Sequence, residues 1–410
     1  MPQTQPLKFR RLGAPQSIVN AMGEYQAMMD AIRDGLVNKA RAICLDDPVV
    51  RAQHLKGFGY FSDASMVEIG PLPASAHLAT ATRNPDIDRL AEDLRTRQTK
   101  TLASGIDMIM ADLKDSLEAP PSGIGGHNSA LVFLYEMPRD PRPDEPGAEW
   151  LQDAQAHRAC LRATETAVVL ANYIRILGWD AKAHSATSSD VCLNACTIAA
   201  GLATLEDGVL VAPWLGTRFG VAVVTTDFDL AHDAALAPQD SQPYWRTRGP
   251  SWWLGMGHAK SALNRDPYRN RDFAKGAHPF ETLRRVDKPT TYIDEMRVAR
   301  VPKRADIFAR AQFGDMGKPL QDGAKGGYYV RKVAPSMAQR QMLGAFVLFQ
   351  DGPSEDGHRR GDAARNTDAV KAARYFLGVD AVGISCCPDW TWYSHDATGT
   401  PPTRRMIRRS

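Results

Sequence analysis

The sequence predicts an α/β protein of the α+β kind, with an N-terminal helical region and an irregular segment that wraps around a central domain. An apolar stripe with helical spacing runs from Ala163 to Leu177. It lies between short apolar runs, such as 130–135 and 221–225, that have the length of buried strands. A long stretch after residue 235 shows neither pattern and is rich in Trp, Arg and Gly, which indicates wrapping segments rather than a second core.

The composition is that of a globular protein, because hydrophobic residues make up 43% and charged residues 24% of the 410 positions. The net charge of +3 gives no reason to expect a nucleic-acid partner. The longest apolar runs are strand-sized, far below the roughly 20 residues of a membrane-spanning helix. Lys8, Arg10 and Arg11 resemble the start of an export signal, but polar residues interrupt the stretch that follows. We therefore expect a cytoplasmic protein without a membrane partner.

The first expected region, residues 1–118, contains amphipathic helical stretches at 87–94 and 102–117. Gly and Pro separate them, for example at 70–73. A Pro- and Gly-rich stretch at 119–147 then marks a linker or domain entry, interrupted by the strand expected at 130–135.

The second expected region, residues 119–235, carries the clearest pattern. The stripe has Gly178 at its end, where glycine commonly terminates a helix. Its members are Ala163, Ala167, Leu170, Ala171, Ile174 and Leu177. A second helix is predicted at 191–202, and the runs 209–212 and 221–225 are interpreted as two strands paired through 213–220.

The third expected region, residues 236–361, is the irregular wrapping or linker segment. It has helical hints near Ile307 and one apolar strand at 345–349. The last region, residues 362–410, starts a new unit, in which Val370, Ala373 and Leu377 define a helical stripe and 381–385 a buried strand. Residues 177–181 and 377–381 match at four of five positions, which favours an internal duplication.

Several stretches resemble cobalamin-dependent reductive dehalogenases of the soluble, catabolic type. They are 199–202, 208–216, 223–227, the segment from Val301 to Gly317, the unit 377–385 and Trp392-Tyr393-Ser394-His395-Asp396. The resemblance covers roughly residues 149–396. It implies that 119–235 has a nitroreductase-like fold that cradles cobalamin in the family, and that complete relatives remove halogen reductively from an aromatic substrate.

The chain departs from the family pattern in one important respect. The resemblance implies two cubane iron–sulfur clusters, each of which needs four thiolates, but no cysteine lies between Asp227 and Cys386. This fits a vestigial cobalamin-type domain at 119–235, followed at 362–410 by the start of an incomplete second one. Four arginines in the last seven residues look like a truncated or frame-shifted end.

We therefore expect the terminal unit to be loosely held. No cofactor is expected in this chain alone, whereas complete relatives would carry cobalamin and 4Fe–4S clusters.

Tyr393, Ser394 and His395 are the candidate cofactor-binding residues. They follow the last expected strand and would lie at its carboxyl end, where α/β folds place ligands. The tyrosine could donate a proton if a nearby cation lowered its pKa, and the alternative is a polar turn. No catalytic residue is assigned.

Two pairs of cysteines could in principle bind a metal ion or a cluster, but no metal site is predicted. Cys192 and Cys196 could share a helix face with His184 as the nearest third ligand, but core packing is favoured. Cys386 and Cys387 point to opposite faces of a strand, so we expect one buried thiol and no cluster.

Other motifs favour structural roles. His258 and His278 lie in Gly-rich loops, and the aromatic groups at 244–246 and 252–253 are interpreted as anchors of the wrapping segment. Residues 123–126 lack the further glycine and the lysine of a phosphate-binding loop.

Three functions follow as hypotheses: an inactive scaffold portion of a reductive dehalogenase, a cobalamin- or flavin-binding protein without clusters, and a structural subunit. The last would pair with a separately encoded catalytic half, and a homo-oligomer is the other expected assembly.

Overall fold

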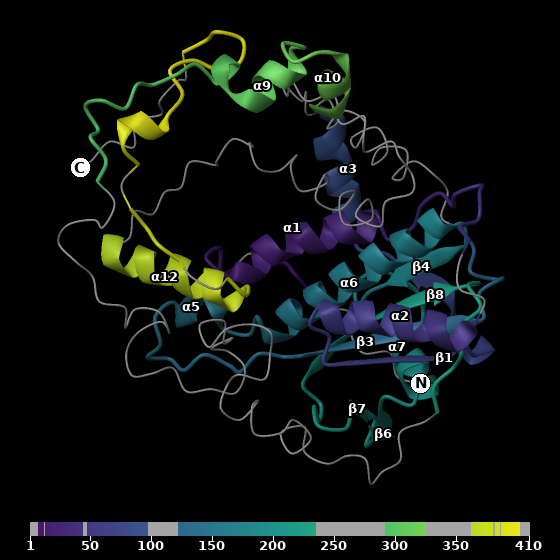
Figure 1. The fold of residues 1–410 in the computed structure, drawn as a ribbon. Coiled ribbons are helices and arrows are strands. Elements are labelled where there is room, and N and C mark those ends of the chain that lie inside the picture. The colour runs from purple at the N-terminus through teal and green to yellow at the C-terminus, as the bar shows by residue number, and fades with distance from the viewer. Residues whose placement is uncertain are drawn as a thin grey trace. The chain divides into compact units, whose positions relative to one another are not determined.

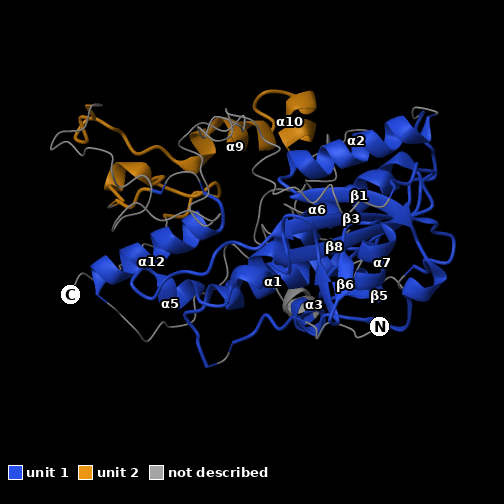
Figure 2. Cartoon of the chain, turned by 90° about the horizontal axis from the view of Figure 1, so that it is seen from below, with its two compact units in different colours: residues 1–98, 109–280, 332–382 blue, residues 99–108, 281–331, 383–410 orange. Residues whose placement is uncertain are grey.

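The computed structural model describes residues 7–11, 13–43, 47–96, 122–234, 292–324, 362–379, 382–385 and 387–401. The chain divides into two compact units (Figure 2). The first comprises Met1–Gln98, Ile109–Phe280 and Lys332–Val382, and the second Thr99–Met108, Glu281–Arg331 and Gly383–Ser410. The predicted elements at 102–117 and 345–349, the aromatic groups at 244–246 and 252–253, and His258 and His278 lie outside the described residues.

A four-stranded antiparallel sheet forms the centre of the first unit (Figure 1). Its order is β1 (Met66–Pro71), β3 (Ser129–Glu136), β8 (Phe219–Thr226) and β4 (Ala181–His184). The central strands β3 and β8 are buried along almost their whole length, as their apolar sequences predict. The expected mixture of helix and sheet is thus confirmed.

Helix α6 (Gln155–Leu177) lies against one face of this sheet, together with α1 (Ile18–Ala31) and α2 (Pro48–Phe61). The predicted stripe is confirmed, since Ala163, Leu170 and Ile174 are buried. Gly178 ends the helix with φ of 98°, a left-handed conformation that costs glycine little. Residues from α6 and all four strands build the first apolar cluster on this face.

The opposite face carries a second apolar cluster, which includes Ala195 and Cys196 from α7 (Leu193–Ala199). Helix α7 is shorter than the predicted 191–202, because Val191 ends β5 (Ser189–Val191). Strand β5 pairs with β2 (His77–Thr82), which directly follows the 3-10 helix η1 (Ala74–Ala76). The N-terminal region therefore contains strands that were not predicted, with Pro71 tolerated as the last residue of edge strand β1.

The predicted pairing of 209–212 with 221–225 is wrong. Strand β7 (Val209–Val211) pairs with β6 (Thr204–Glu206) in a separate hairpin, whereas β8 pairs with β3 and β4. The physical reason is burial: β8 is apolar on both faces and lies in the covered middle of the sheet, whereas β6 and β7 are largely exposed.

Helix α12 (Ala363–Phe376) belongs to the first unit, and this corrects two expectations. Its buried face contains Ala369, Ala372 and Phe376, while Val370 and Leu377 of the predicted stripe are 38% and 40% exposed. Phe376 joins a third apolar cluster with Phe9 and others, so the helix is packed rather than loose. The other members are Val19, Met22, Leu151, Ala154, Ala372, Ala373 and Tyr375.

Two contacts near α5 (Ala148–Leu151) fix this helix further. Glu149 pairs with Arg365 of α12, and Gly147 lets the helices approach, because a Cβ there would lie 2.6 Å from the Ala372 side chain. Gly378 ends α12 with φ of 96°, like Gly178 after α6, but residues 382–385 form no strand, contrary to the prediction. The remaining element of this unit, α3 (Asp86–Thr96), confirms the predicted helix at 87–94.

The described part of the second unit contains short elements: η3 (Lys303–Ala305), α9 (Ile307–Gln312), α10 (Lys318–Ala324) and η5 (Asp389–Thr391). The helix expected near Ile307 is confirmed as α9, with Asp306 capping it by accepting from the Phe308 and Ala309 amides. Arg304 holds Asp315 through both guanidinium nitrogens and lies over the Phe313 ring.

Candidate functional site

The most charged buried site of the described chain lies beside β4 in the first unit. The Lys182 ammonium is fully buried and lies 3.3 Å from Asp34 and 3.2 Å from Asp190. It also donates to the Ser122 carbonyl oxygen at 2.8 Å. Arg33 donates to Asp190 at 2.7 Å, so two cations face two carboxylates. We call Arg33, Asp34, Lys182 and Asp190 the buried charge cluster.

The two carboxylates of the buried charge cluster are held ionised. Burial alone would raise the pKa of Asp34, but hydrogen bonds from Ser122 and the charge of Lys182 outweigh it and lower the pKa to about 2. Burial also opposes ionisation of Asp190, and the charge of Arg33 prevails, so that its pKa is lowered as well. Each charge therefore has a partner, as buried charges require.

Asp30 lies fully buried on α1, where four side chains donate to its carboxyl group. Ser185 and Gln26 donate to one oxygen at 2.6 and 3.1 Å, and Thr187 and Asn84 to the other at 2.5 and 2.9 Å. Burial raises the pKa of Asp30, and these hydrogen bonds partly offset the effect. The group joins α1 to the turn before β5 and to the start of α3.

A row of polar side chains crosses from β4 to the segment before β3. His184 Nε2 lies 2.8 Å from the Thr225 hydroxyl, and the same hydroxyl lies 2.8 Å from His127 Nδ1. His127 Nε2 lies 3.3 Å from Asp180 Oδ2, a contact without good hydrogen-bond direction. Both ring nitrogens of His184 have partners, since Nδ1 accepts from the Asp190 amide at 3.2 Å. His184 is therefore not an open metal ligand.

A fourth polar group lies at the edge strand β1. Lys56 donates to Glu68 at 3.0 Å and to Asp233 at 2.8 Å, and the two carboxyl groups share a hydrogen bond. Burial and then the neighbouring Asp233 raise the pKa of Glu68 to about 7. Asp233 also accepts from the Ile69 amide, so this group ties the chain after β8 to the sheet edge.

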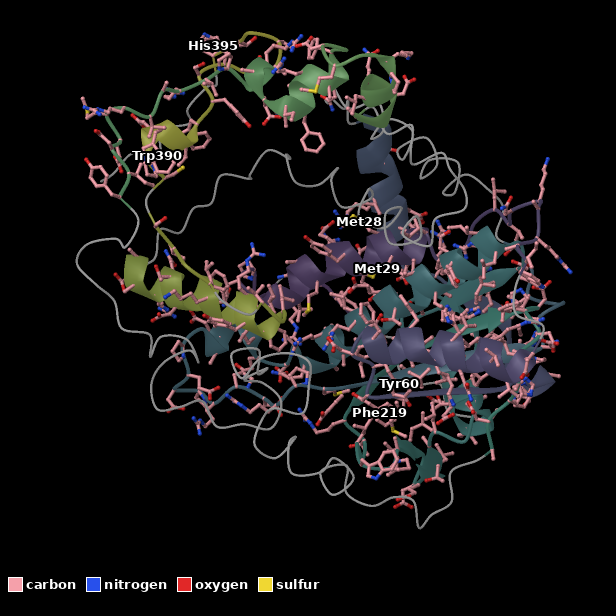
Figure 3. The ribbon with its side chains drawn as sticks, viewed as in Figure 1. Met28, Met29, Tyr60, Phe219, Trp390 and His395 are labelled. Carbon is pink, nitrogen blue, oxygen red and sulfur yellow. The ribbon has the colours of Figure 1, made fainter. Side chains whose placement is uncertain are left out.

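The candidate residues Tyr393, Ser394 and His395 lie in the second unit, in the irregular segment after η5, and Figure 3 labels His395 there and Trp390 in η5 itself. The Tyr393 hydroxyl donates to Asp306 at 3.1 Å, and the Ser394 amide donates to the Val301 carbonyl. The neighbour of the Tyr393 hydroxyl is a carboxylate, not the cation of the hypothesis, and the hydrogen bond to Asp306 raises the pKa of Tyr393. That pKa shift disfavours release of its proton.

The described cysteines do not gather around a metal. Cys196 is buried against the sheet, where burial raises the pKa of its thiol to about 12, and burial raises that of Cys160 to about 11. Cys387 is exposed, and Cys44 and Cys386 lie outside the described residues. Within those residues, no three His, Cys, Asp or Glu side chains are arranged to hold a metal ion.

A pocket of about 250 Å³ lies between the N-terminal segment, α1 and α3. Arg89 pairs there with Glu24 at 2.6 Å and lies 3.6 Å from Asp86, which also faces Arg10. The arginines of this pocket are matched by carboxylates, and the pocket is below the roughly 300 Å³ at which small-molecule sites begin.

Two glycines of the central sheet, Gly70 and Gly220, are the points where helices approach the strands closely, and a corrinoid does not fit there. A Cβ at Gly220 of β8 would lie 2.5 Å from main-chain atoms of Ala159 and Cys160 in α6. On β1, a Cβ at Gly70 would lie 2.6 Å from the Ala200 backbone. Helix backbone therefore occupies the space beside both strands and leaves no room for a corrinoid at these two positions.

Comparison with solved structures gives high-scoring neighbours. One is the structure that suggests a mechanism for B12-dependent dehalogenation, with a TM-score of 0.69, 31% sequence identity, and coverage of 96% of this chain and 51% of that chain. These neighbours are reductive dehalogenases. The catabolic reductive dehalogenase NpRdhA, N-terminally tagged, and its complex with 3-bromo-4-hydroxybenzoic acid each match at 30% identity with the same TM-score and coverage.

The likeness to reductive dehalogenases thus extends over nearly the whole chain, which spans about half the length of these solved structures. The chain matches no family model, and no curated protein matches it significantly. No helix among the described residues is long and apolar enough to cross a membrane.

Sequence reasoning did not find the buried charge cluster or Asp30. Lys182 alternates with alanines in β4, a pattern typical of a half-exposed strand, and its partners Asp34 and Ser122 are distant in sequence. The available signal was the density of polar side chains at 180–190, where Asp, Lys, His, Ser and Thr interrupt an otherwise apolar region.

Proposed function

We propose that this chain supplies the scaffold portion of a reductive dehalogenase, in which halogen is removed reductively from an aromatic substrate. The observation that carries the proposal is the match of 96% of the chain to dehalogenases at 30 to 31% identity. Cobalamin and 4Fe–4S clusters, which would supply the redox chemistry, would be held by polypeptide outside these 410 residues. We also propose that the first unit has the nitroreductase-like fold of cobalamin-type domains.

The buried polar groups support a structural role for the first unit. Lys182 and His184 are fully buried, and the ammonium group and both ring nitrogens have partners. Helix backbone packs directly against the sheet at Gly70 and Gly220. Such groups rigidify a fold and leave no reacting atom exposed.

For Tyr393, Ser394 and His395 we propose contacts to a cofactor held by the catalytic half. All three belong to the second unit, and the side chains of Tyr393 and His395 are exposed. With Asp306 as acceptor, the Tyr393 hydroxyl is oriented as a hydrogen-bond donor rather than as a ready acid. Tyr393→Phe would test this contact without removing the ring.

A chimera tests the proposed function. The matched half of NpRdhA is replaced by this chain, and cobalamin content, iron content and debromination of 3-bromo-4-hydroxybenzoic acid are measured. We expect a loaded chimera that debrominates, and Tyr393→Phe in it should lower cobalamin content or turnover. A chimera that binds both cofactors but does not debrominate would contradict the scaffold role.

The alternative is a protein that binds cobalamin or flavin without clusters. This alternative is favoured by the packing of α12 in the third apolar cluster, because a truncated fragment is expected to hold its last unit loosely. Equilibrium dialysis of the purified chain against hydroxocobalamin and against flavin mononucleotide separates the two proposals. Binding of about one molecule per chain would favour the alternative, and absorbance spectra would identify which chromophore is bound.

A further inference from the structure

The Thr225 hydroxyl lies between two buried imidazoles, and its single hydrogen atom restricts how the three groups can bond. His184 comes from β4, Thr225 from β8 and His127 from the segment before β3. Both contacts measure 2.8 Å, and all three side chains are buried. A hydroxyl has one hydrogen to donate and two lone pairs, so the contacts are not independent of each other.

The direction of the row is set at His184. The Asp190 main-chain amide can only donate, and it points at His184 Nδ1 at 3.2 Å. Nδ1 must therefore carry the lone pair. Burial, and then the positive charge of Arg33, hold the pKa of His184 well below its usual value, so the ring is neutral and its hydrogen lies on Nε2. His184 donates to Thr225.

The second contact can use the hydrogen of the hydroxyl. Thr225 accepts from His184 with one of its two lone pairs, so its own hydrogen is available to His127 Nδ1, 2.8 Å away. In that arrangement Nδ1 of His127 carries a lone pair and the hydrogen of the ring lies on Nε2, which faces Asp180 Oδ2 at 3.3 Å.

We propose that Asp190, His184, Thr225 and His127 form a one-way hydrogen-bond chain, an acid-released lock that joins β4 and β8 to residues 122–128. A proton added to either imidazole would convert its Nδ1 from acceptor to donor. At His184 it would then oppose the Asp190 amide, and at His127 it would force the Thr225 hydroxyl to turn its hydrogen away from the ring. The lock does not depend on the proposed dehalogenase role.

The charged surroundings favour this behaviour. His184 faces Asp190, Lys182 and Arg33, and Lys182 and Arg33 already neutralise the Asp34 and Asp190 carboxylates. His127 faces Asp180. Since the pKa of His184 is lower in the folded than in the unfolded chain, its contribution to stability is present above pH 6.5 and is lost as the pH falls below that value.

Nitrogen NMR of the full chain, labelled in its ten histidines, tests the lock. At pH 7.5 we expect both rings to carry a hydrogen on Nε2 and none on Nδ1, and His184 should keep that form until the protein unfolds in acid. An imidazolium signal from His127 at pH 7.5, or a hydrogen on Nδ1 of either ring, would overturn the proposal.

Thr225→Val identifies the two signals and tests the link between them. The variant keeps the shape and removes the hydroxyl, so both imidazole signals should change and His127 should no longer be restricted to the Nε2–H form. The control is Thr197→Val, an equally buried threonine that donates to the Leu193 carbonyl of its own helix. Unchanged histidine signals in Thr225→Val would sink the proposal. If that variant does not fold, the wild-type spectrum decides alone.

Discussion

Asp34 is the residue whose charge state has the clearest measurable effect. Its folded-state pKa of about 2 is below the ordinary aspartate value of 3.8, so the ionised form stabilises the fold above pH 3.8. We expect Asp34→Asn to lower the free energy of unfolding by about 2 kcal/mol at pH 7, since one pKa unit corresponds to about 1.4 kcal/mol. The difference from wild type should shrink between pH 4 and pH 2.

Urea denaturation at pH 7 and pH 3 measures this difference. Asp229→Asn is the control, because the Asp229 side chain is 73% exposed and its ion pair with Arg51 is screened by water. A loss in Asp34→Asn that is equal at both pH values would show that the carboxylate charge is not the cause.

At the scale of single residues, the sequence predicted the apolar core residues better than it predicted the buried charged ones. Leu170 and Ile174 were assigned to the core because helix periodicity is a local property. Lys182 and Asp34 come from segments nearly 150 positions apart, and nothing local to either residue encodes their meeting. Tyr393 lies in an irregular segment beside an acid that no spacing rule would have indicated.

Helix α6 is the element on which the first unit depends most. We predict that Leu170→Asp, which places an unpaired carboxylate in the first apolar cluster, costs several kcal/mol. Thermal unfolding followed by circular dichroism measures the effect. A variant that keeps the parent melting temperature would show that α6 does not pack as described.

The contact between α6 and β8 gives a sharper test with a smaller change. Gly220→Ala adds one methyl group against the Ala159 backbone, and overpacking of this kind typically costs about 1 to 3 kcal/mol. The matched control is Gly57→Ala in the middle of α2, where a Cβ meets nothing within 4 Å. That control should gain about 0.5 to 1 kcal/mol from better helix propensity. Equal effects in both variants would contradict the close packing.

The elements show why strand pairing was harder to predict than helix position. Strand β8 was found from its apolar run, but its partners β3 and β4 lie about 90 and 40 positions earlier, and the nearer β7 was chosen instead. Proximity in sequence is a common guide to pairing, and it fails where an intervening hairpin folds on itself. The predicted apolar stripe of α12 is shifted by one residue from the face that is buried, because alanines and not Val370 form that face.

At the scale of the whole molecule, the chain should not hold an iron–sulfur cluster. Burial raises the pKa values of the Cys160 and Cys196 thiols, which disfavours the thiolates that cluster iron requires. Anaerobic reconstitution with iron and sulfide, then desalting and iron analysis, should leave no stoichiometric cluster. Stable retention of about four irons per chain would refute this prediction.

Limited proteolysis tests how α12 belongs to the first unit. Phe376 and Tyr375 are 0% and 1% exposed in the third apolar cluster, so trypsin-cleaved protein should keep the α12 peptide bound until denaturant is added. Size-exclusion chromatography followed by mass spectrometry detects the peptide. Phe376→Ala should release it at lower denaturant, whereas Leu377→Ala, at a 40% exposed position, should not. Release of the wild-type peptide in buffer would mean that α12 is loosely attached.

The third apolar cluster also bears on the order in which the protein can fold during synthesis. Phe9, Val19 and Met22 leave the ribosome early, but Tyr375 and Phe376, which cover them, follow about 350 residues later. At about 5 to 20 residues per second, the N-terminal side of this cluster would wait on the order of 20 to 70 s for its partner helix. During that interval its apolar side chains are available to chaperones and to other nascent chains. Slower translation of the second half should therefore raise the aggregated fraction, whereas supplying the α12 peptide in trans should lower it.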